Sequence, residues 1–137
     1  MRRNIVCLPL VLAGAIFAAP LRAQEGHPLV GSWHGEWGPP GSADRMDLTV
    51  IMDWDGSVIT GLVNPVTDRA PLENAELDSG TWTVRFEVEV RDNAGNRVRC
   101  RADGQLDNLG SDRRTLAGTW SCGATEAEFE LTRDRDY

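Results

Sequence analysis

The chain has no lysine and few of the residues from which catalytic sites are commonly built. All 14 basic residues are arginine, and 21 aspartates and glutamates outnumber them, which gives a formal net charge of −7. An acidic surface repels phosphate groups and anionic lipids, so neither nucleic acid nor a membrane surface is expected as a partner. The chain has only two histidines, one of them near its mature amino terminus, so a Ser-His-Asp triad is not expected.

Enzyme and metal motifs are also absent from the sequence. There is no Gly-x-Ser-x-Gly, no His-Glu-x-x-His and no phosphate-binding glycine loop. His34 and Glu36 share one side of a predicted strand, but a metal ion needs a third ligand, and His27 lies outside that strand. Residues 53–57 begin like a calcium loop and lack its bidentate glutamate. The chain is therefore interpreted as a non-enzyme without a cofactor or metal.

The only long apolar run is at the amino terminus. Residues 1–23 combine two early arginines with an uncharged apolar stretch over 5–19, and Ala23 is a plausible cleavage point. This pattern is typical of a secretory signal peptide, and its core is too short for a membrane span. Residues 24–137 are then one exported domain, periplasmic or secreted.

Apolar and polar residues alternate without a break over 82–90 and again over 97–102. Period-2 alternation predicts strands with one buried face and one wet face. A hairpin with Arg91 opposite Arg97 pairs the outer faces by charge and the inner faces by apolar contact. The other opposed pairs are then Glu89 with Arg99, Glu87 with Arg101, Arg85 with Asp103, Val90 with Val98, and Val88 with Cys100.

Turn residues recur at short intervals along the chain, and no segment has helical periodicity. Eight strands are predicted, over residues 29–37, 45–54, 57–63, 72–78, 81–91, 97–107, 114–122 and 125–133. Asp55-Gly56 is expected as a tight turn that places Met52 opposite Ile59. Because closure removes exposed edges, the sequence predicts an all-β fold, an eight-stranded antiparallel up-and-down barrel after a cleaved signal peptide. An open sandwich is the alternative.

Cys100 and Cys122 are the two cysteines that remain after the signal peptide, and export favours a disulfide between them. When Cys100 is placed opposite Cys122, the inward residues of the two strands stay in phase. The other pairs in this register are Ala102 with Trp120, Gly104 with Gly118, and Leu106 with Leu116. In the last hairpin Trp120 then faces Ala127, Gly118 faces Phe129 and Leu116 faces Leu131. Two free buried thiols are the alternative to the disulfide.

The first predicted strand opens with Gly31-Ser32-Trp33, followed by Gly35, and the last one closes with residues 129–133. These motifs resemble the Gly-x-Trp opening of the calycins, the lipocalin and avidin-like barrels, and their closing strand, which often ends in arginine. The resemblance implies that Arg133 covers Trp33 and seals one end of the barrel by stacking on its indole. The chain also resembles small exported bacterial proteins with a Gly-x-Trp-x-Gly start and a Phe-x-Leu-Thr-Arg end, a group of undefined function.

Five tryptophans stand out in a chain with a single tyrosine. Trp33, Trp82 and Trp120 follow the strand alternation and are interpreted as structural core residues. Trp37 and Trp54 lie at strand ends, where they could rim the mouth of the barrel and contact a ligand. The first functional hypothesis is therefore a barrel that binds a small apolar or aromatic molecule through these two residues.

Three apolar side chains, Ile51, Val58 and Leu62, are expected on the outer face of adjacent strands. They predict either a protein interface, including a homodimer contact, or a surface covered by the loop at 64–71. A second functional hypothesis follows, in which the protein is an inhibitor or interaction module that acts through the loops at 38–44 and 64–71.

Overall fold

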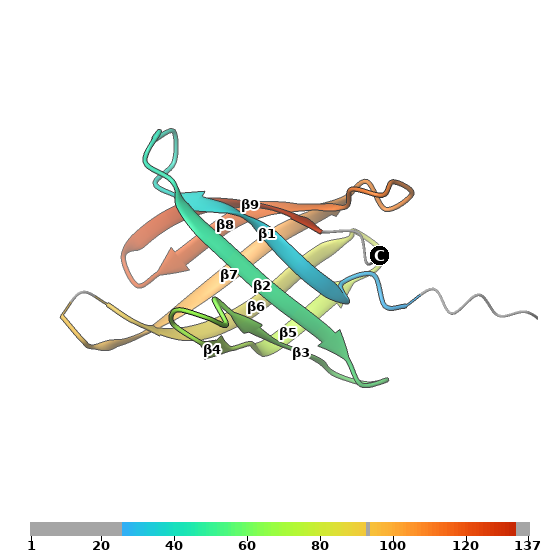
Figure 1. Ribbon diagram of the computed structural model, residues 1–137, viewed down its shortest axis with the longest axis horizontal. Helices are drawn as coiled ribbons and strands as arrows, with labels where there is room; N and C mark the ends of the chain where they lie inside the picture. The colour runs from blue at the N-terminus through green and yellow to red at the C-terminus, as the bar shows by residue number, and fades with distance from the viewer. Residues whose placement is uncertain (1–25, 93, 134–137) are drawn as a thin grey trace, which may run out of the picture.

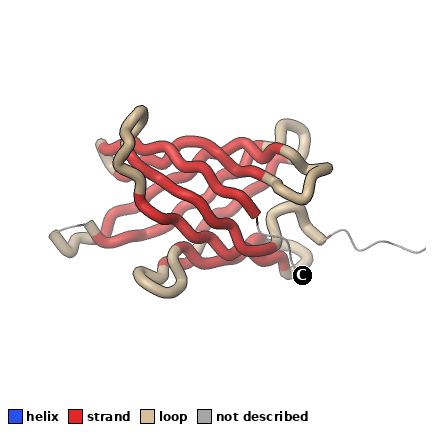
Figure 2. Tube along the Cα trace, turned by 45° about the horizontal axis from the view of Figure 1, so that its top comes forward, coloured by secondary structure: helices blue, strands red, loops and turns tan. Residues whose placement is uncertain are grey.

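The computed structural model describes residues 26–92 and 94–133. This part of the chain forms nine strands: β1 (Gly31–Gly38), β2 (Met46–Trp54), β3 (Ile59–Val63), β4 (Ala70–Pro71), β5 (Glu73–Asp78), β6 (Thr83–Arg91), β7 (Arg97–Asp107), β8 (Thr115–Cys122) and β9 (Thr125–Arg133). They make one antiparallel sheet in the order β4-β3-β2-β1-β9-β8-β7-β6-β5, which curls into a nearly closed barrel (Figure 1, Figure 2). The predicted signal peptide over 1–23 lies outside the described residues. Within them, no helix has the length and hydropathy needed to span a bilayer.

One segment of chain brings the two edges of the sheet together. β4 pairs with β3, whereas β5, two residues further on, pairs with β6 at the other edge. Between them the Leu72 N–H donates to the Gly61 carbonyl at 3.0 Å. The prediction of eight strands is thus corrected to nine, because the end of the loop expected over 64–71 forms the short strand β4 beside β3.

The connections between strands define the two ends of the barrel. The Leu29 end carries residues 27–30 and the loops after β2, β5 and β7, and it lies to the right in Figure 1. The Trp37 end carries the loops after β1, β3, β6 and β8. Each ligand-contact candidate can therefore be assigned to one end.

Three of the predicted hairpin registers are confirmed. In β6–β7 Arg91 lies opposite Arg97 and Val88 opposite Cys100, as the alternation requires. In β7–β8 and β8–β9 Trp120 lies opposite Ala102 on one side and Ala127 on the other. The inward-facing residues of these four strands are largely buried. A slip of one residue would turn all of them to water, so burial holds the register in place.

The predicted register of the β2–β3 hairpin is wrong by two residues. Met52 lies opposite Gly61, and Trp54 occupies the place opposite Ile59 that had been assigned to Met52. A shift of two residues preserves the alternation, so the inner and outer faces are still the predicted ones.

The side chain of Asp55 explains this shift. Its Oδ1 atom accepts hydrogen bonds from the backbone N–H groups of Ser57 at 2.8 Å and Val58 at 2.7 Å. The tight turn therefore forms one residue later than predicted, at Gly56-Ser57, where the Asp55 N–H donates to the Val58 carbonyl at 3.3 Å. The same two hydrogen bonds, that from Val58 first, lower the pKa of the Asp55 carboxyl.

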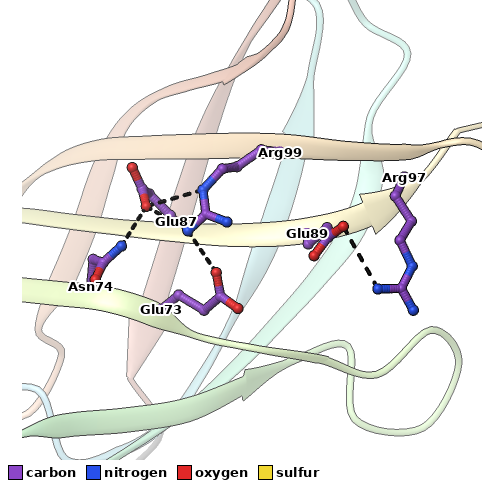
Figure 3. A network of polar contacts seen from close by, with 6 residues as sticks. All are labelled: Glu73, Asn74, Glu87, Glu89, Arg97 and Arg99. Carbon is purple, nitrogen blue, oxygen red and sulfur yellow. Dashed lines mark hydrogen bonds and ion pairs between the residues drawn. The ribbon is translucent and has the colours of Figure 1, made fainter.

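Charged side chains form a network on the outer face of β5, β6 and β7 (Figure 3). The Nη2 atom of Arg99 lies 2.6 Å from a Glu73 oxygen and 2.8 Å from a Glu87 oxygen. Asn74 donates to the same Glu87 oxygen at 2.7 Å. The hydrogen bonds from Asn74 and Arg99 lower the pKa of the Glu87 carboxyl.

Glu87 and Glu89 on β6 each pair with an arginine two residues away from the one directly opposite. Arg101 is the residue opposite Glu87, and Arg99 is opposite Glu89, as predicted. The ion pairs nevertheless join Glu87 to Arg99 and Glu89 to Arg97, which are diagonal neighbours. Strand twist brings such diagonals within reach of long side chains.

The disulfide predicted between Cys100 and Cys122 is confirmed, and it joins directly opposed residues of β7 and β8. The bond closes a loop with a sequence separation of 22 residues. In the chain-entropy model, a loop of this size stabilises the native state by about 3 kcal/mol.

We expect the Cys100→Ser/Cys122→Ser variant to lose about 3 kcal/mol of unfolding free energy, measured by urea denaturation. Mass spectrometry of the unreduced wild type should show a mass about 2 Da below that of the dithiol form. A wild-type mass that does not rise on reduction would rule out the bond.

Candidate functional site

Side chains fill the middle of the barrel. Trp33 has none of its surface exposed, and Phe86 and Phe129 are almost as deeply buried. The Trp120 ring meets Phe86 at 6.0 Å and Phe129 at 6.4 Å between centroids, both edge to face. Because such packing leaves little room for a guest, a ligand has to be sought at the ends or on the outer face.

The short segment before β1 covers the Leu29 end. The Leu29 side chain is 1% exposed and joins the core. Three consecutive backbone carbonyls of this segment accept hydrogen bonds from side chains of the barrel. Arg114 Nη1 donates to Pro28 at 3.0 Å, Trp33 Nε1 to Leu29 at 2.9 Å, and Arg133 Nη1 to Val30 at 3.1 Å. The segment is therefore an integral part of the fold.

Arg133 lies directly opposite Trp33 in the β1–β9 ladder. Its side chain also packs on Gly31, where an added Cβ would lie 3.0 Å from the arginine Cδ. Gly31 has a φ of 132°, which a residue with a side chain rarely adopts. The glycine thus leaves space for the arginine chain on its way to the Val30 carbonyl.

We expect Arg133→Ala to lower the unfolding free energy by about 1–2 kcal/mol, because it removes a part-buried hydrogen bond and the packing over Gly31. Arg113→Ala, at an exposed position in the loop after β7, is the matched control and should be close to neutral. Equal stabilities of the two variants in urea would contradict this role for Arg133.

His27 and Trp54 stack against each other at the Leu29 end. Their ring centroids are 4.5 Å apart, and the ring planes are inclined by 22°. The Leu29 N–H donates to His27 Nδ1 at 3.3 Å, which requires that this nitrogen carry no proton. Burial lowers the pKa of His27, in agreement with a neutral ring.

A lowered pKa of His27 makes the protein less stable in acid. The unfolded chain takes up a proton near pH 6.5, whereas the folded chain resists it until a lower pH. The stabilisation is therefore complete above about pH 6.5 and declines as the pH falls toward the pKa of the folded state. We expect the unfolding free energy to fall between pH 7.5 and about 5.5, and less so in His27→Gln.

His34→Gln is the matched control, because His34 lies on the exposed face of β1, away from residues 27–30. Urea denaturation at a series of pH values measures the effect. An unchanged pH dependence in His27→Gln would show that the stacked imidazole does not produce it.

A pocket of about 380 Å³ opens beside this stack. We call it the Trp54 pocket, and its lining residues are His27, Trp54, Ser57, Ile59, Ala75, Glu76, Leu77 and Asp78. Leu72 and β4 link β3 to β5. The pocket forms beyond this link, where no strand pairing among the described residues joins β3 to β5. The Trp54 side chain is 37% exposed, an unusual position for so large an aromatic group.

The Trp37 end has a different character. Trp37 is partly buried and lies 6.4 Å from Trp120 between ring centroids. Met46, the residue opposite Trp37, is 51% exposed. The loop after β1 is tied to the outer face of β9, since the Gly41 N–H donates to a Glu128 carboxylate oxygen at 2.8 Å. This loop stands away from the barrel in Figure 1.

The two tryptophans predicted as ligand contacts do not share a site. Trp54 ends β2 at the Leu29 end, while Trp37 pairs with the first residue of that strand, Met46. Eight strand residues separate the two positions by roughly 25 Å. One small molecule therefore cannot touch both.

The predicted core tryptophans take different positions. Trp33 and Trp120 are buried. Trp82 precedes β6 instead of lying within it, with a φ of 56°, and is partly buried against the core. Its carbonyl accepts a hydrogen bond from the Leu106 N–H at 2.9 Å, which anchors this turn to β7.

Ile51 and Leu62 lie on the adjacent strands β2 and β3 as predicted, whereas Val58 lies in the loop before β3. Ile51 lies opposite Leu62, and Leu62 lies opposite Pro71 on the next strand. Ile51 is 39% exposed and Val58 is 53% exposed. The chain after β3 runs beside that strand as β4, within the sheet, so this short strand does not cover the outer face.

Four glutamates line a groove of about 510 Å³ outside β8, β9 and β1: Glu36, Glu126, Glu128 and Glu130. Glu36 and Glu130 lie opposite each other in the ladder. Among the described residues, no group of three or more histidine, cysteine, aspartate or glutamate side chains has an arrangement that could hold a metal ion. The groove is an acidic feature of the surface.

Comparison with known proteins does not assign this chain to a family. No protein-family model matches this chain, and no curated protein matches it significantly. The fold and the geometry of the two ends therefore carry the functional argument.

Sequence reasoning missed the segment before β1. The sequence pattern excludes His27 as a third metal ligand, because it lies outside the strand, and nothing in its neighbours predicts a stack with Trp54. The apolar pair Leu29-Val30 was the available signal, since it extends the alternation that begins at Gly31. It was assigned to the first strand, whereas the structure folds it across the end of the barrel.

Proposed function

We propose that this protein is a small exported barrel of calycin type that binds a small apolar or aromatic molecule. The antiparallel barrel, with Trp33 opposite Arg133 on its first and last strands, supports the calycin assignment. The Cys100–Cys122 disulfide supports export, because such bonds persist in oxidising compartments.

The observation that carries the ligand proposal is the exposed Trp54 indole beside a pocket with an apolar floor. Ile59, Ala75 and Leu77 lie below it, and His27 holds the ring from one side. A volume of about 380 Å³ is within the range of small-molecule sites. Because side chains fill the interior, the molecule binds at the Leu29 end and not in a deep cup.

We expect 2-naphthylmethanol, a neutral flat probe, to quench the tryptophan fluorescence of the protein. Trp54→Leu should weaken its binding about fivefold to tenfold, because an aromatic contact contributes about 1 kcal/mol beyond its buried area. Trp37→Leu is the matched control and should leave the affinity unchanged.

Isothermal titration calorimetry checks the affinity independently of the fluorescence that each variant loses. If the affinity falls in Trp37→Leu and not in Trp54→Leu, the ligand binds at the Trp37 end. Absence of binding to all three proteins would contradict the proposal.

A second candidate function is that of an inhibitor or interaction module. The loops after β1 and β3, which the sequence singled out, lie at the same end of the barrel. This end exposes Val66 by 94% and Met46 by 51%, both large apolar side chains. Exposed apolar residues at the same end of the barrel favour contact with a protein surface.

A further inference from the structure

The Trp54 pocket combines an aromatic wall with an uncompensated negative charge. Of the described residues that line it, Glu76 and Asp78 carry carboxylates and none carries a guanidinium. The Asp78 carboxylate accepts a hydrogen bond from the Gly80 N–H at 2.8 Å and so holds the turn after β5. Glu76 is the carboxylate left to face a ligand.

The arginine opposite Glu76 in the ladder forms its ion pair with another carboxylate, which it shares with Arg101. Arg85 is the residue opposite Glu76, but its Nε atom lies 2.8 Å from an Asp103 oxygen. No other described residue forms an ion pair or a hydrogen bond with the Glu76 side chain. Glu73 and Glu87, in contrast, both form ion pairs with Arg99.

The aromatic wall offers no competing positive charge. The His27 ring accepts the Leu29 N–H through Nδ1, and this bond holds the imidazole neutral. The Trp54 indole is partly exposed, and indole is the aromatic side chain that attracts a cation most strongly. Ring and carboxylate therefore favour the same sign of charge in a ligand.

We propose that the Trp54 pocket selects an organic cation, a molecule with a flat or apolar body and an ammonium group. The body lies on Ile59 and Leu77, while the ammonium meets the Trp54 ring and the Glu76 carboxylate. An anion of the same shape is repelled. This inference rests on the proposed ligand-binding function and adds the chemical class of the ligand.

Two probes of nearly equal shape test the charge. Protonated 2-naphthylmethylamine and neutral 2-naphthylmethanol are titrated by calorimetry at neutral pH and about 0.15 M salt, where charges farther than about 8 Å are screened. We expect the ammonium to bind about tenfold more tightly than the alcohol. We expect Glu76→Gln to remove most of this ratio while the affinity for the alcohol stays the same.

Glu126→Gln is the matched control, because it removes the same charge from the acidic groove outside β9. It should retain the wild-type ratio. A ratio near one in the wild type, or a ratio unchanged by Glu76→Gln, would overturn the inference and leave the proposed function in place. Absence of binding by both probes would overturn the proposed function itself.

Discussion

Trp33 lies in the middle of the barrel with none of its surface exposed, and aromatic rings from three other strands fill the space on the side of the Trp37 end. This packing is the constraint on which the rest of the structure depends. A closed sheet with small interior volume reaches native density only if every second residue is inward and the large ones interdigitate. Since the interior is full, anything that the protein binds has to bind at its margins.

The two ends meet this constraint in different ways. At the Leu29 end, three side-chain donors fix three consecutive carbonyls, and Leu29 covers Trp33. The segment 27–30 does not cover the space between β3 and β5. This space, lined by Trp54, is the pocket on which the proposed function rests. At the Trp37 end, the loop after β1 is tied to Glu128, and apolar side chains are exposed.

Charge determines which class of molecule the proposed site at the end of the barrel binds. The outer face of β5, β6 and β7 carries acidic and basic side chains that form ion pairs across the strands. Exposed pairs of this kind contribute little to stability. Glu76 belongs to the same strand as Glu73 but lacks such a partner among the described residues, so its charge remains available beside the indole. The cation preference follows from this difference.

The sequence by itself determined most of the strands, their inner and outer faces, three hairpin registers and the disulfide, because period-2 alternation is local and any slip of one residue would expose the core. It did not determine the β2–β3 register, since a slip of two residues costs no burial and a single Asp55 carboxylate decides the loop. Only the tertiary structure separated Trp37 from Trp54, stacked His27 on Trp54 and opened the pocket beside them. These features depend on which strand ends meet in space and on where the barrel seam opens, and neither is recorded in the pattern of a single strand.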